Sequence, residues 1–282
     1  NPENSDVINL FLHEFGYYPY VDESKLMQTN AVIQEEHKVS LRKDVYLHTK
    51  QMEIFLYLLS KRSVILSAPT SFGKTLLVDA YISYVQPKVV ALIFPTLALI
   101  DECRRRLKAI FGEKYRFVTH PDEAINLPQK VIYIMTQERF NSLERIPKLD
   151  FFFVDEFYLV DRPEQRGSRA WSLNLAIYRG VRQSIVSFMA GPFVEHVILD
   201  EAWSERFAFI QSNFRTVTVN QYNRSEVGNK YSAFLSDLKN CGTQPGLVFC
   251  SSPDSARTLL ANIVRDSEVI EGERILALAE WV

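Results

Sequence analysis

Eight consecutive residues, Ala68-Pro-Thr-Ser-Phe-Gly-Lys-Thr75, carry the strongest chemical signal in the chain. They follow the short apolar run 63–67 and precede a longer apolar stretch, so we expect a loop that opens a helix. The N–H groups of such a loop favour an anion, and Gly73 lets a ligand approach the backbone closely. Lys74 can neutralise phosphates, and the Thr75 hydroxyl can bind Mg²⁺. The segment predicts a phosphate-binding loop; the alternative is a chance Gly-Lys-Thr at a helix start.

A second signal is the pair of adjacent carboxylates Asp155 and Glu156, which follows the hydrophobic run 151–154. Active groups of open α/β sheets lie at the carboxyl ends of strands. Asp155 could hold there the Mg²⁺ bound by the phosphate loop, and Glu156 could polarise an attacking water. Many strands end in acidic residues at the surface, so the pair alone is a weak signal. It gains weight from the phosphate loop 81 positions earlier (155 minus 74).

Alternating strand and helix patterns from residue 47 onward supply the frame for both motifs. Continuous runs of Val, Ile, Leu and Phe are typical of strands buried on both faces of a parallel sheet. Their alternation with helical stretches predicts an α/β, doubly wound fold with helices on both faces. The expected strands are 63–67, 89–94, 115–118, 131–135, 151–154 and 184–188, and the expected helices are 50–60, 75–85, 97–111, 137–144 and 168–180.

A second compositional unit begins near residue 225. A helix at 229–240, an apolar strand at 247–250 and a helix at 253–265 form the pattern of a first βα unit of another α/β domain, and a last helix is expected at 272–282. We therefore expect three parts: an N-terminal accessory helical segment (1–45), a complete nucleotide-binding domain (46–224) and the truncated start of a second domain (225–282). The chain is then part of a larger protein.

Composition narrows the functional classes. Lys plus Arg number 32 and Asp plus Glu 34, giving a net charge of -2, which excludes a broadly basic nucleic-acid binder and a disordered acidic tail. An enzyme that places a few cations locally stays possible. The three cysteines form no CxxC pair, which argues against a secreted disulfide framework. No apolar run is long enough to span a bilayer. We expect a cytoplasmic or otherwise intracellular protein without a membrane partner.

The motifs resemble those of the first motor domain of superfamily 2 helicases of the DEAD/DEAH-like kind. The loop is similar to the family's motif I, AxxGxGKT, except that Ser71 replaces a glycine, and residues 154–158 resemble the DExx motif II, except that Tyr158 replaces His or Asp. The resemblance implies a RecA-like fold, the cofactors ATP and Mg²⁺, and catalytic roles for Lys74, Asp155 and Glu156. The ATP-binding loop it implies consists of Ala68, Pro69, Thr70, Ser71, Phe72, Gly73, Lys74 and Thr75, with Thr75 and Asp155 as Mg²⁺ ligands.

A weaker match concerns the base of the nucleotide. Gln51 precedes Lys74 by 23 positions (74 minus 51), close to the spacing of the family's adenine-reading glutamine. A glutamine amide offers one donor group and one acceptor, which suits the edge of adenine. A solvated glutamine on a helix is an equally good interpretation of this residue alone.

Three further matches follow expected strands. Pro95-Thr96 and the segment Thr136–Arg139 stand where the family has motifs Ia and Ib, so the resemblance assigns Pro95, Thr96, Thr136 and Arg139 to the nucleic-acid backbone. Both threonines are also suited to cap a helix. Ala190 and Gly191 stand where the family has motif III, which couples hydrolysis to movement. Arg166-Gly167 and the strand 247–250 resemble the Ski2-like branch, and the motif I sequence resembles helicase subunits of bacterial anti-phage defence, which act with a partner protein.

These features favour an ATP-dependent motor that moves along or unwinds DNA or RNA and holds it, as a single strand, by its phosphates. An ATP-gated nucleic-acid-binding switch without unwinding activity, working inside a larger complex, is the alternative that the divergent motifs leave open. A different P-loop enzyme such as a small-molecule kinase is disfavoured, because it would not require the motifs at 95–99, 136–139 and 247–250. Since the motif VI arginines of the family are absent from these 282 residues, we expect weak hydrolysis by this stretch alone.

Overall fold

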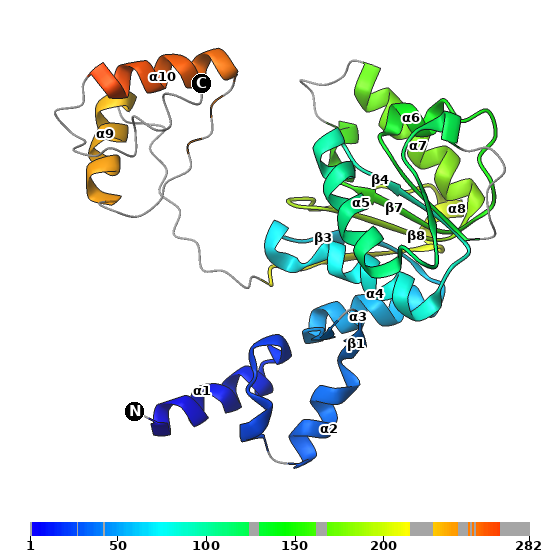
Figure 1. Ribbon diagram of the computed structural model, residues 1–282, viewed down its shortest axis with the longest axis horizontal. Helices are drawn as coiled ribbons and strands as arrows, with labels where there is room; N and C mark the ends of the chain where they lie inside the picture. The colour runs from blue at the N-terminus through cyan, green and yellow to red at the C-terminus, as the bar shows by residue number, and fades with distance from the viewer. Residues whose placement is uncertain are drawn as a thin grey trace. The chain divides into compact units, whose positions relative to one another are not determined.

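A seven-stranded, wholly parallel sheet forms the centre of the protein (Figure 1). The computed structural model describes residues 2–26, 28–41, 43–123, 130–161, 168–214, 228–241, 248, 250 and 252–265. In spatial order, the strands are β5 (Arg116–Val118), β6 (Val131–Met135), β4 (Val89–Ile93), β7 (Leu149–Asp155), β8 (Ser184–Gly191), β3 (Ser63–Ser67) and β9 (Phe207–Gln211). The order places β3, which precedes the phosphate loop, beside β8 and one strand away from β7.

Each strand sends alternate side chains to the two faces of the sheet, and both faces are apolar. Leu66, Leu92 and Phe153 face one hydrophobic core together with residues of α3 (Thr49–Leu59), α4 (Lys74–Val85) and α5 (Leu97–Phe111). Ile65 and Phe152 face a second core with residues of α6 (Gln137–Asn141) and α7 (Ser168–Gln183). The sheet therefore has helices on both sides, as Figure 1 shows, which confirms the predicted doubly wound fold.

The predicted strands and helices of this region are confirmed, with end points that shift by a few residues. The strand that the sequence pattern missed is β9, at the edge of the sheet beside β3. Only Phe207 of its five residues is buried, and exposed residues alternate with half-buried ones. Residues 207–210 are nevertheless all apolar, so the run that marks the other strands is present in β9 as well.

The N-terminal residues, which were expected to be helical, form two helices and also a small hairpin, and only the hairpin was not predicted. The elements are α1 (Pro2–Glu14), α2 (Gln28–Glu36), β1 (Lys38–Ser40) and β2 (Asp44–Tyr46), with β1 antiparallel to β2. Gly16, at a φ of 74°, follows α1 and carries a backbone carbonyl that accepts from Thr49 N–H, the first residue of α3. The chain from α1 thus meets the helix that precedes the phosphate loop.

Two units are distinguished by their internal contacts: Asn1–Thr218, and Val219–Val282. The sheet and α8 (Glu201–Ser204) lie in the first unit, whereas the second contains α9 (Lys230–Cys241) and α10 (Pro253–Arg265), close to two predicted helices. Arg166-Gly167 and the predicted helix 272–282 lie outside the described residues, as do Leu247 and Phe249 of the predicted strand 247–250. Where the second domain begins stays a prediction.

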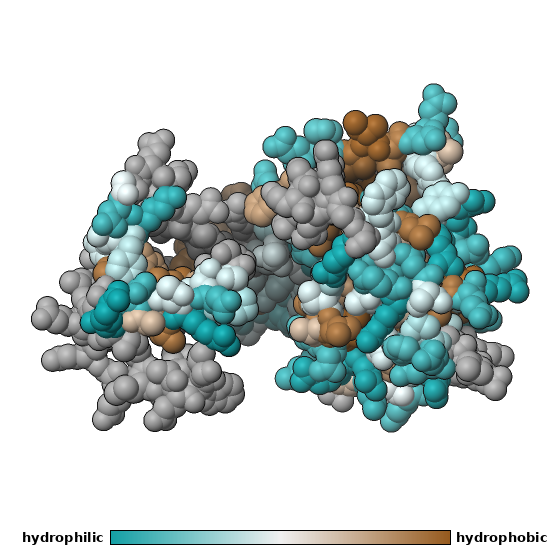
Figure 2. Space-filling model, turned by 90° about the horizontal axis from the view of Figure 1, so that it is seen from above, coloured by the Kyte–Doolittle hydropathy of each residue, from teal (hydrophilic) through white to brown (hydrophobic). Residues whose placement is uncertain are grey.

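The surface carries no broad apolar band on the face seen in Figure 2, where hydrophilic residues predominate and hydrophobic ones are exposed in separate places. Within the described part of the chain, no helix is both long and apolar enough to cross a bilayer.

Candidate active site

The phosphate loop has the predicted position between β3 and α4. Its residues Thr70–Phe72 form one turn of 3-10 helix, and Gly73 then adopts a left-handed backbone with a φ of 83° before α4 begins at Lys74. A Cβ atom added at Gly73 would lie 2.5 Å from Nε2 of Gln51. Glycine is therefore required here both by the backbone conformation and by the close approach of a side chain.

Gln51 lies under this loop rather than in solvent, so the solvated interpretation of this residue is wrong. Its side chain is buried, its Nε2 donates to the carbonyl of Phe72 (2.8 Å), and its Oε1 accepts from the backbone N–H of His48 (3.0 Å). The backbone N–H of Gln51 in turn donates to Nδ1 of His48 (3.2 Å), so the two residues form a reciprocal cap at the start of α3. Adenine recognition by Gln51 stays a prediction; its observed role is to hold the phosphate loop.

Lys74 is a buried cation. Among the described residues, its hydrogen-bond partners are carbonyl oxygens. Its Nζ donates to Ala68 (3.2 Å) and Pro69 (3.4 Å). Burial lowers the pKa of this ammonium group, while the nearby carboxylates of Glu156 and Asp155 act to raise it. A buried charge with neutral partners favours an anion, so this loop fits the phosphates of a nucleotide.

Asp155 and Glu156 stand at the carboxyl end of β7. Burial, and then the neighbouring Glu156 carboxylate, raise the pKa of Asp155 to about 6, and Lys74 opposes this shift. Glu156 has a left-handed backbone with a φ of 53°, which directs the chain into a turn immediately after the strand. The carboxylate of Asp155 and the half-exposed hydroxyl of Thr75 are hard oxygen donors, the set that Mg²⁺ prefers, so the residues present fit this ion.

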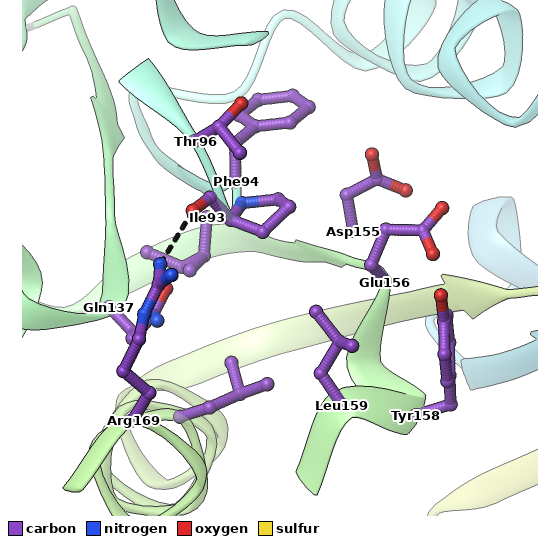
Figure 3. A pocket seen from close by; sticks show the side chains of 11 residues that line it. Ile93, Phe94, Thr96, Gln137, Asp155, Glu156, Tyr158, Leu159 and Arg169 are labelled. Carbon is purple, nitrogen blue, oxygen red and sulfur yellow. Dashed lines mark hydrogen bonds between the residues drawn. The ribbon is translucent and has the colours of Figure 1, made fainter. Parts of the chain in front are cut away.

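A cavity of about 320 Å³ opens beside the two carboxylates (Figure 3). It is lined from three strand ends: Pro95 and Thr96 after β4, Gln137 after β6, and Asp155 and Glu156 after β7. Residues of the loop 68–75 are not among those that line it. The cavity therefore joins Asp155 and Glu156 to the two segments that the sequence analysis assigned to nucleic acid.

Both threonines assigned to the nucleic-acid backbone cap helices. Oγ1 of Thr96 accepts from the N–H of Leu99 (3.3 Å), and Oγ1 of Thr136 accepts from the N–H of Arg139 (3.3 Å). The capping interpretation is confirmed, and it leaves their proposed contact with phosphates as a prediction. Thr96 is exposed, whereas Thr136 is 8% exposed and Arg139 donates from Nη1 to the carbonyl of Thr119 (3.1 Å). Thr96 is thus the better placed of the two hydroxyls.

Arg169, near the start of α7, is a site residue that sequence analysis missed. Its Nη2 donates to the carbonyl of Pro95 (2.8 Å), the bond drawn in Figure 3, and its Nε forms an ion pair with Glu138 (3.3 Å). Gln137 donates to the same Glu138 oxygen (2.8 Å). Arg169 thus ties the segment after β4 to the one after β6. No motif marks it, because its partners are a backbone carbonyl and a residue 31 positions away.

Replacement of Arg169 should therefore weaken nucleic-acid binding and leave the rate of ATP hydrolysis unchanged. Without the guanidinium, Pro95 and Glu138 lose their link, so we expect Arg169→Ala to weaken single-strand binding about tenfold, equivalent to about 1.4 kcal/mol, with kcat at saturating nucleic acid unchanged. Arg169→Lys keeps a charge for Glu138 but lacks the planar fork whose separate Nε and Nη2 atoms reach Glu138 and Pro95, so it should be intermediate. Fluorescence anisotropy and steady-state ATPase measurements separate the two effects. Arg62→Ala, which removes an exposed arginine elsewhere, is the control; a fall in kcat with unchanged affinity contradicts the assignment.

The predicted coupling residues Ala190 and Gly191 contact both the phosphate loop and the strand that carries Asp155. The carbonyl of Gly191 accepts from the N–H of Ala68 (3.0 Å), and Ala190 lies opposite Asp155 in the β7–β8 register. A Cβ atom added at Gly191 would lie 2.8 Å from the ring of Tyr158. The aromatic residue that replaces His or Asp after the DExx motif therefore packs on a glycine that has room for it. Whether this contact transmits hydrolysis to movement stays a prediction.

An aromatic cluster packs against Phe72 of the phosphate loop. The ring of His48 stacks on Phe214 (centroids 3.9 Å apart) and contacts Phe72 of the loop edge-on (4.9 Å), and Tyr17 stacks on the same Phe214 (4.6 Å). Burial lowers the pKa of His48 to about 4, although an interaction with the backbone of Phe72 opposes the shift. The Nδ1 atom accepts a hydrogen bond from Gln51, so the neutral ring is the form that the cap requires.

Acidification should consequently destabilise this region. The pKa of His48 is about 4 in the folded protein and 6.5 for the free side chain, so the unfolded chain binds the proton more readily. The stability that neutral His48 provides is complete above pH 6.5 and is lost as pH falls toward 4, by up to about 3 kcal/mol. Urea unfolding at a series of pH values measures this loss. His48→Asn keeps a capping oxygen and cannot titrate, so its pH profile should be flatter; equal slopes would contradict the role of His48.

The comparison with protein families agrees with this fold and arrangement. The model of the DEAD/DEAH box helicase family matches residues 48–189, about half of the chain, from the residue before α3 to Met189 within β8. The chain belongs to the DEAD/DEAH box helicase family.

Among known proteins, the chain is similar to "Anti-bacteriophage protein B" of Escherichia coli (strain K12), with 29% identity over 275 residues, covering 93% of this chain and 38% of that protein. The chain therefore spans well under half the length of this relative. Its fold is similar to the "DUF1998 helicase MrfA", solved with DNA (TM-score 0.54, 18% identity, 79% of this chain, 36% of the other) and without it (TM-score 0.54, 19% identity, 80% and 40%).

Proposed function

We propose that the protein is the first motor domain of an ATP-dependent nucleic-acid helicase or translocase. The observation that carries this proposal is the convergence of Lys74, Asp155 and Glu156 at the carboxyl ends of β3 and β7, which flank β8 in the sheet of a DEAD/DEAH box helicase domain. The carboxylates of Glu156 and Asp155 act to raise the pKa of Lys74, which supports a grouping of one buried cation with two acids. This is the set that phosphoryl transfer to water requires.

Each residue has a distinct part in the proposed reaction. Lys74 and the first N–H groups of α4 bind the phosphates, because the first turn of a helix has no internal acceptors for them. Thr75 and Asp155 would hold Mg²⁺, which when bound neutralises developing charge on the phosphate oxygens. Glu156 is the group that can accept a proton from the attacking water. The pKa of Asp155, raised to about 6, leaves it mostly ionised at neutral pH.

The cavity beside Glu156 suggests how nucleic acid could influence this chemistry. Its walls include Thr96 and Gln137, from the segments proposed to hold the nucleic-acid backbone, and Glu156 itself. A strand bound at Thr96 would change the polar surroundings of the carboxylate across a space of about 320 Å³. The proposed partner is single-stranded DNA or RNA, held through phosphates rather than bases.

Stimulation of ATP hydrolysis by nucleic acid tests the proposal. The full-length protein should hydrolyse ATP faster in the presence of single-stranded DNA or RNA, and the stimulation should weaken as salt rises, because phosphate contacts release counterions. Duplex DNA and a panel of small phosphate acceptors are the comparison substrates. Turnover that ignores every nucleic acid but transfers phosphate to a small acceptor contradicts the motor and favours a kinase.

An ATP-gated switch is the second candidate, favoured by the close packing of Tyr158 on Gly191. A switch would bind nucleic acid in an ATP-dependent manner without displacing a strand, so a strand-displacement assay run beside the ATPase assay separates the two. The similarity to an E. coli protein named for its action against bacteriophage supports a role in phage defence, for a motor as well as for a switch. Plating efficiency of phage on cells with and without the gene tests that role.

A further inference from the structure

Helix α7 has an apolar stripe on the side that faces away from the sheet. Its inner face is buried: Ala170, Leu173, Ala176 and Val181 are at most 6% exposed. Trp171, Leu175 and Tyr178 are nevertheless 75%, 49% and 52% exposed. With Arg182 these residues follow the spacing i, i+4, i+7, i+11, and at ~100° per residue they lie within about 60° of one another around the helix.

This stripe is unusual for a helix that already covers a core. A helix packed on one side normally presents polar residues on the other. Gly180 fixes which side packs, because a Cβ atom there would lie 2.2 Å from the ring of Phe152 in β7. The stripe therefore cannot turn inward without losing this contact, and it is available to another molecule.

A basic groove continues from the stripe. It has a volume of about 840 Å³ and is lined by the segment Leu143–Lys148 and by Tyr178, Arg179, Arg182, Gln183 and Tyr133. The lining of this groove contains four cationic side chains and one carboxylate, Glu144. The cations are Arg145, Lys148, Arg179 and Arg182. Arg145 and Lys148 are exposed and form no ion pair with a residue of the described chain. Tyr178 and Arg182 belong to both stripe and groove, and Arg182 donates to the Tyr178 hydroxyl (2.7 Å).

We propose that the stripe and groove together dock an acidic amphipathic helix of a partner protein. The alternating spacing of four and three is the one by which two helices pack along a seam. The adjoining cations select acidic residues on the flank of the docked helix. Trp, Tyr and Arg are also the residue types that most often dominate the affinity of protein interfaces.

The position of the groove argues for a protein rather than nucleic acid. Residues 143–148 precede β7, and Arg182 immediately precedes β8, so the groove lies toward the amino ends of these strands. The segments proposed to hold nucleic acid follow the carboxyl ends of β4 and β6. The groove shares no lining residue with the cavity beside Asp155 and Glu156, whereas the stripe begins at Trp171, two residues after Arg169 of that cavity.

A pair of synthetic helical peptides tests the proposal. Both carry Leu at the alternating spacing of four and three; one has Glu and the other Lys at the flanking positions, and each is fluorescently labelled. The full-length protein should bind the Glu peptide at least tenfold more tightly than the Lys peptide, as measured by anisotropy. Trp171→Ala and Tyr178→Ala should each weaken the Glu peptide at least tenfold, and Arg182→Glu should reduce its advantage over the Lys peptide. Ile198→Ala, which trims an apolar side chain that is 90% exposed outside the stripe, should have no effect.

Several results would overturn the proposal. Absence of binding, or equal binding of the two peptides, removes the acidic helix as the occupant. Displacement of the Glu peptide by a single-stranded oligonucleotide would assign the surface to nucleic acid instead. Self-association that Trp171→Ala abolishes, measured by sedimentation, would assign it to a second copy of this chain. Unchanged melting temperatures of the variants confirm that the fold is intact, as expected for exposed positions.

Discussion

Glu156→Gln should reduce ATP turnover by about 100-fold or more while nucleotide binding is retained. The substitution keeps the size of the side chain but removes the group that can accept a proton from water, and general-base catalysis typically contributes 10²–10⁴-fold. Lys74 and Asp155 remain to bind the nucleotide. Because the Glu156 carboxylate raises the pKa of Asp155, its loss should also lower that pKa and leave Asp155 more fully ionised. Turnover is measured with saturating single-stranded nucleic acid, and binding with a fluorescent ATP analogue.

Glu102→Gln is the matched control, because Glu102 is an exposed glutamate on α5 and does not line the cavity. It should leave both turnover and binding unchanged. Full turnover by Glu156→Gln would mean that another group accepts the proton. A parallel loss of nucleotide binding would mean that Glu156 contributes to the ground state, and either result would require a new assignment of this residue.

Lys74→Ala should abolish both nucleotide binding and hydrolysis, in contrast to the change at Glu156. The substitution removes the one cation that reaches the loop carbonyls of Ala68 and Pro69 within the described site. Loss of a positioned charge of this kind commonly costs 10²–10³-fold in rate. It also removes the cation that holds down the pKa of Asp155, so that pKa should rise above about 6 and Mg²⁺ binding should weaken at neutral pH.

Isothermal titration with ATP and Mg²⁺ measures the loss of affinity for Lys74→Ala, and Lys114→Ala, an exposed lysine after α5, serves as its control. Burial penalises the charge of Lys74, so its removal should not lower the thermal stability of the empty protein. Normal ATP affinity in a folded Lys74→Ala protein would exclude the loop 68–75 as the phosphate site.

Most strands of the sheet could be predicted because each contains a run of consecutive apolar residues. β4 and residues 151–154 of β7 are buried on both faces of the sheet and therefore consist of uninterrupted apolar residues. The edge strand β9 was not predicted although its residues 207–210 are apolar, and the strands of the hairpin β1–β2 have only three residues each. The motif residues were equally visible, because the phosphate loop requires glycine, lysine and threonine in a fixed order.

The contacts around those motifs could not be predicted in the same way. Arg169 bonds to a main-chain carbonyl, which any residue could supply, and the hydrogen bond from Gln51 to the carbonyl of Phe72 joins residues 21 positions apart. Phe214 reaches His48 from 166 positions away (214 minus 48). Local sequence patterns predict elements and their ends, whereas partners brought together by the sheet order depend on the completed fold.

The left-handed backbone of Glu156 has a consequence for how this protein can change over time. The left-handed conformation costs a residue with a Cβ atom roughly 1–2 kcal/mol relative to the right-handed one, whereas glycine has no such cost. Glycine at position 156 would therefore favour the fold while removing the carboxylate. Selection for thermostability and selection for hydrolysis act in opposite directions at this position, so libraries screened for heat resistance alone should lose Glu156 readily.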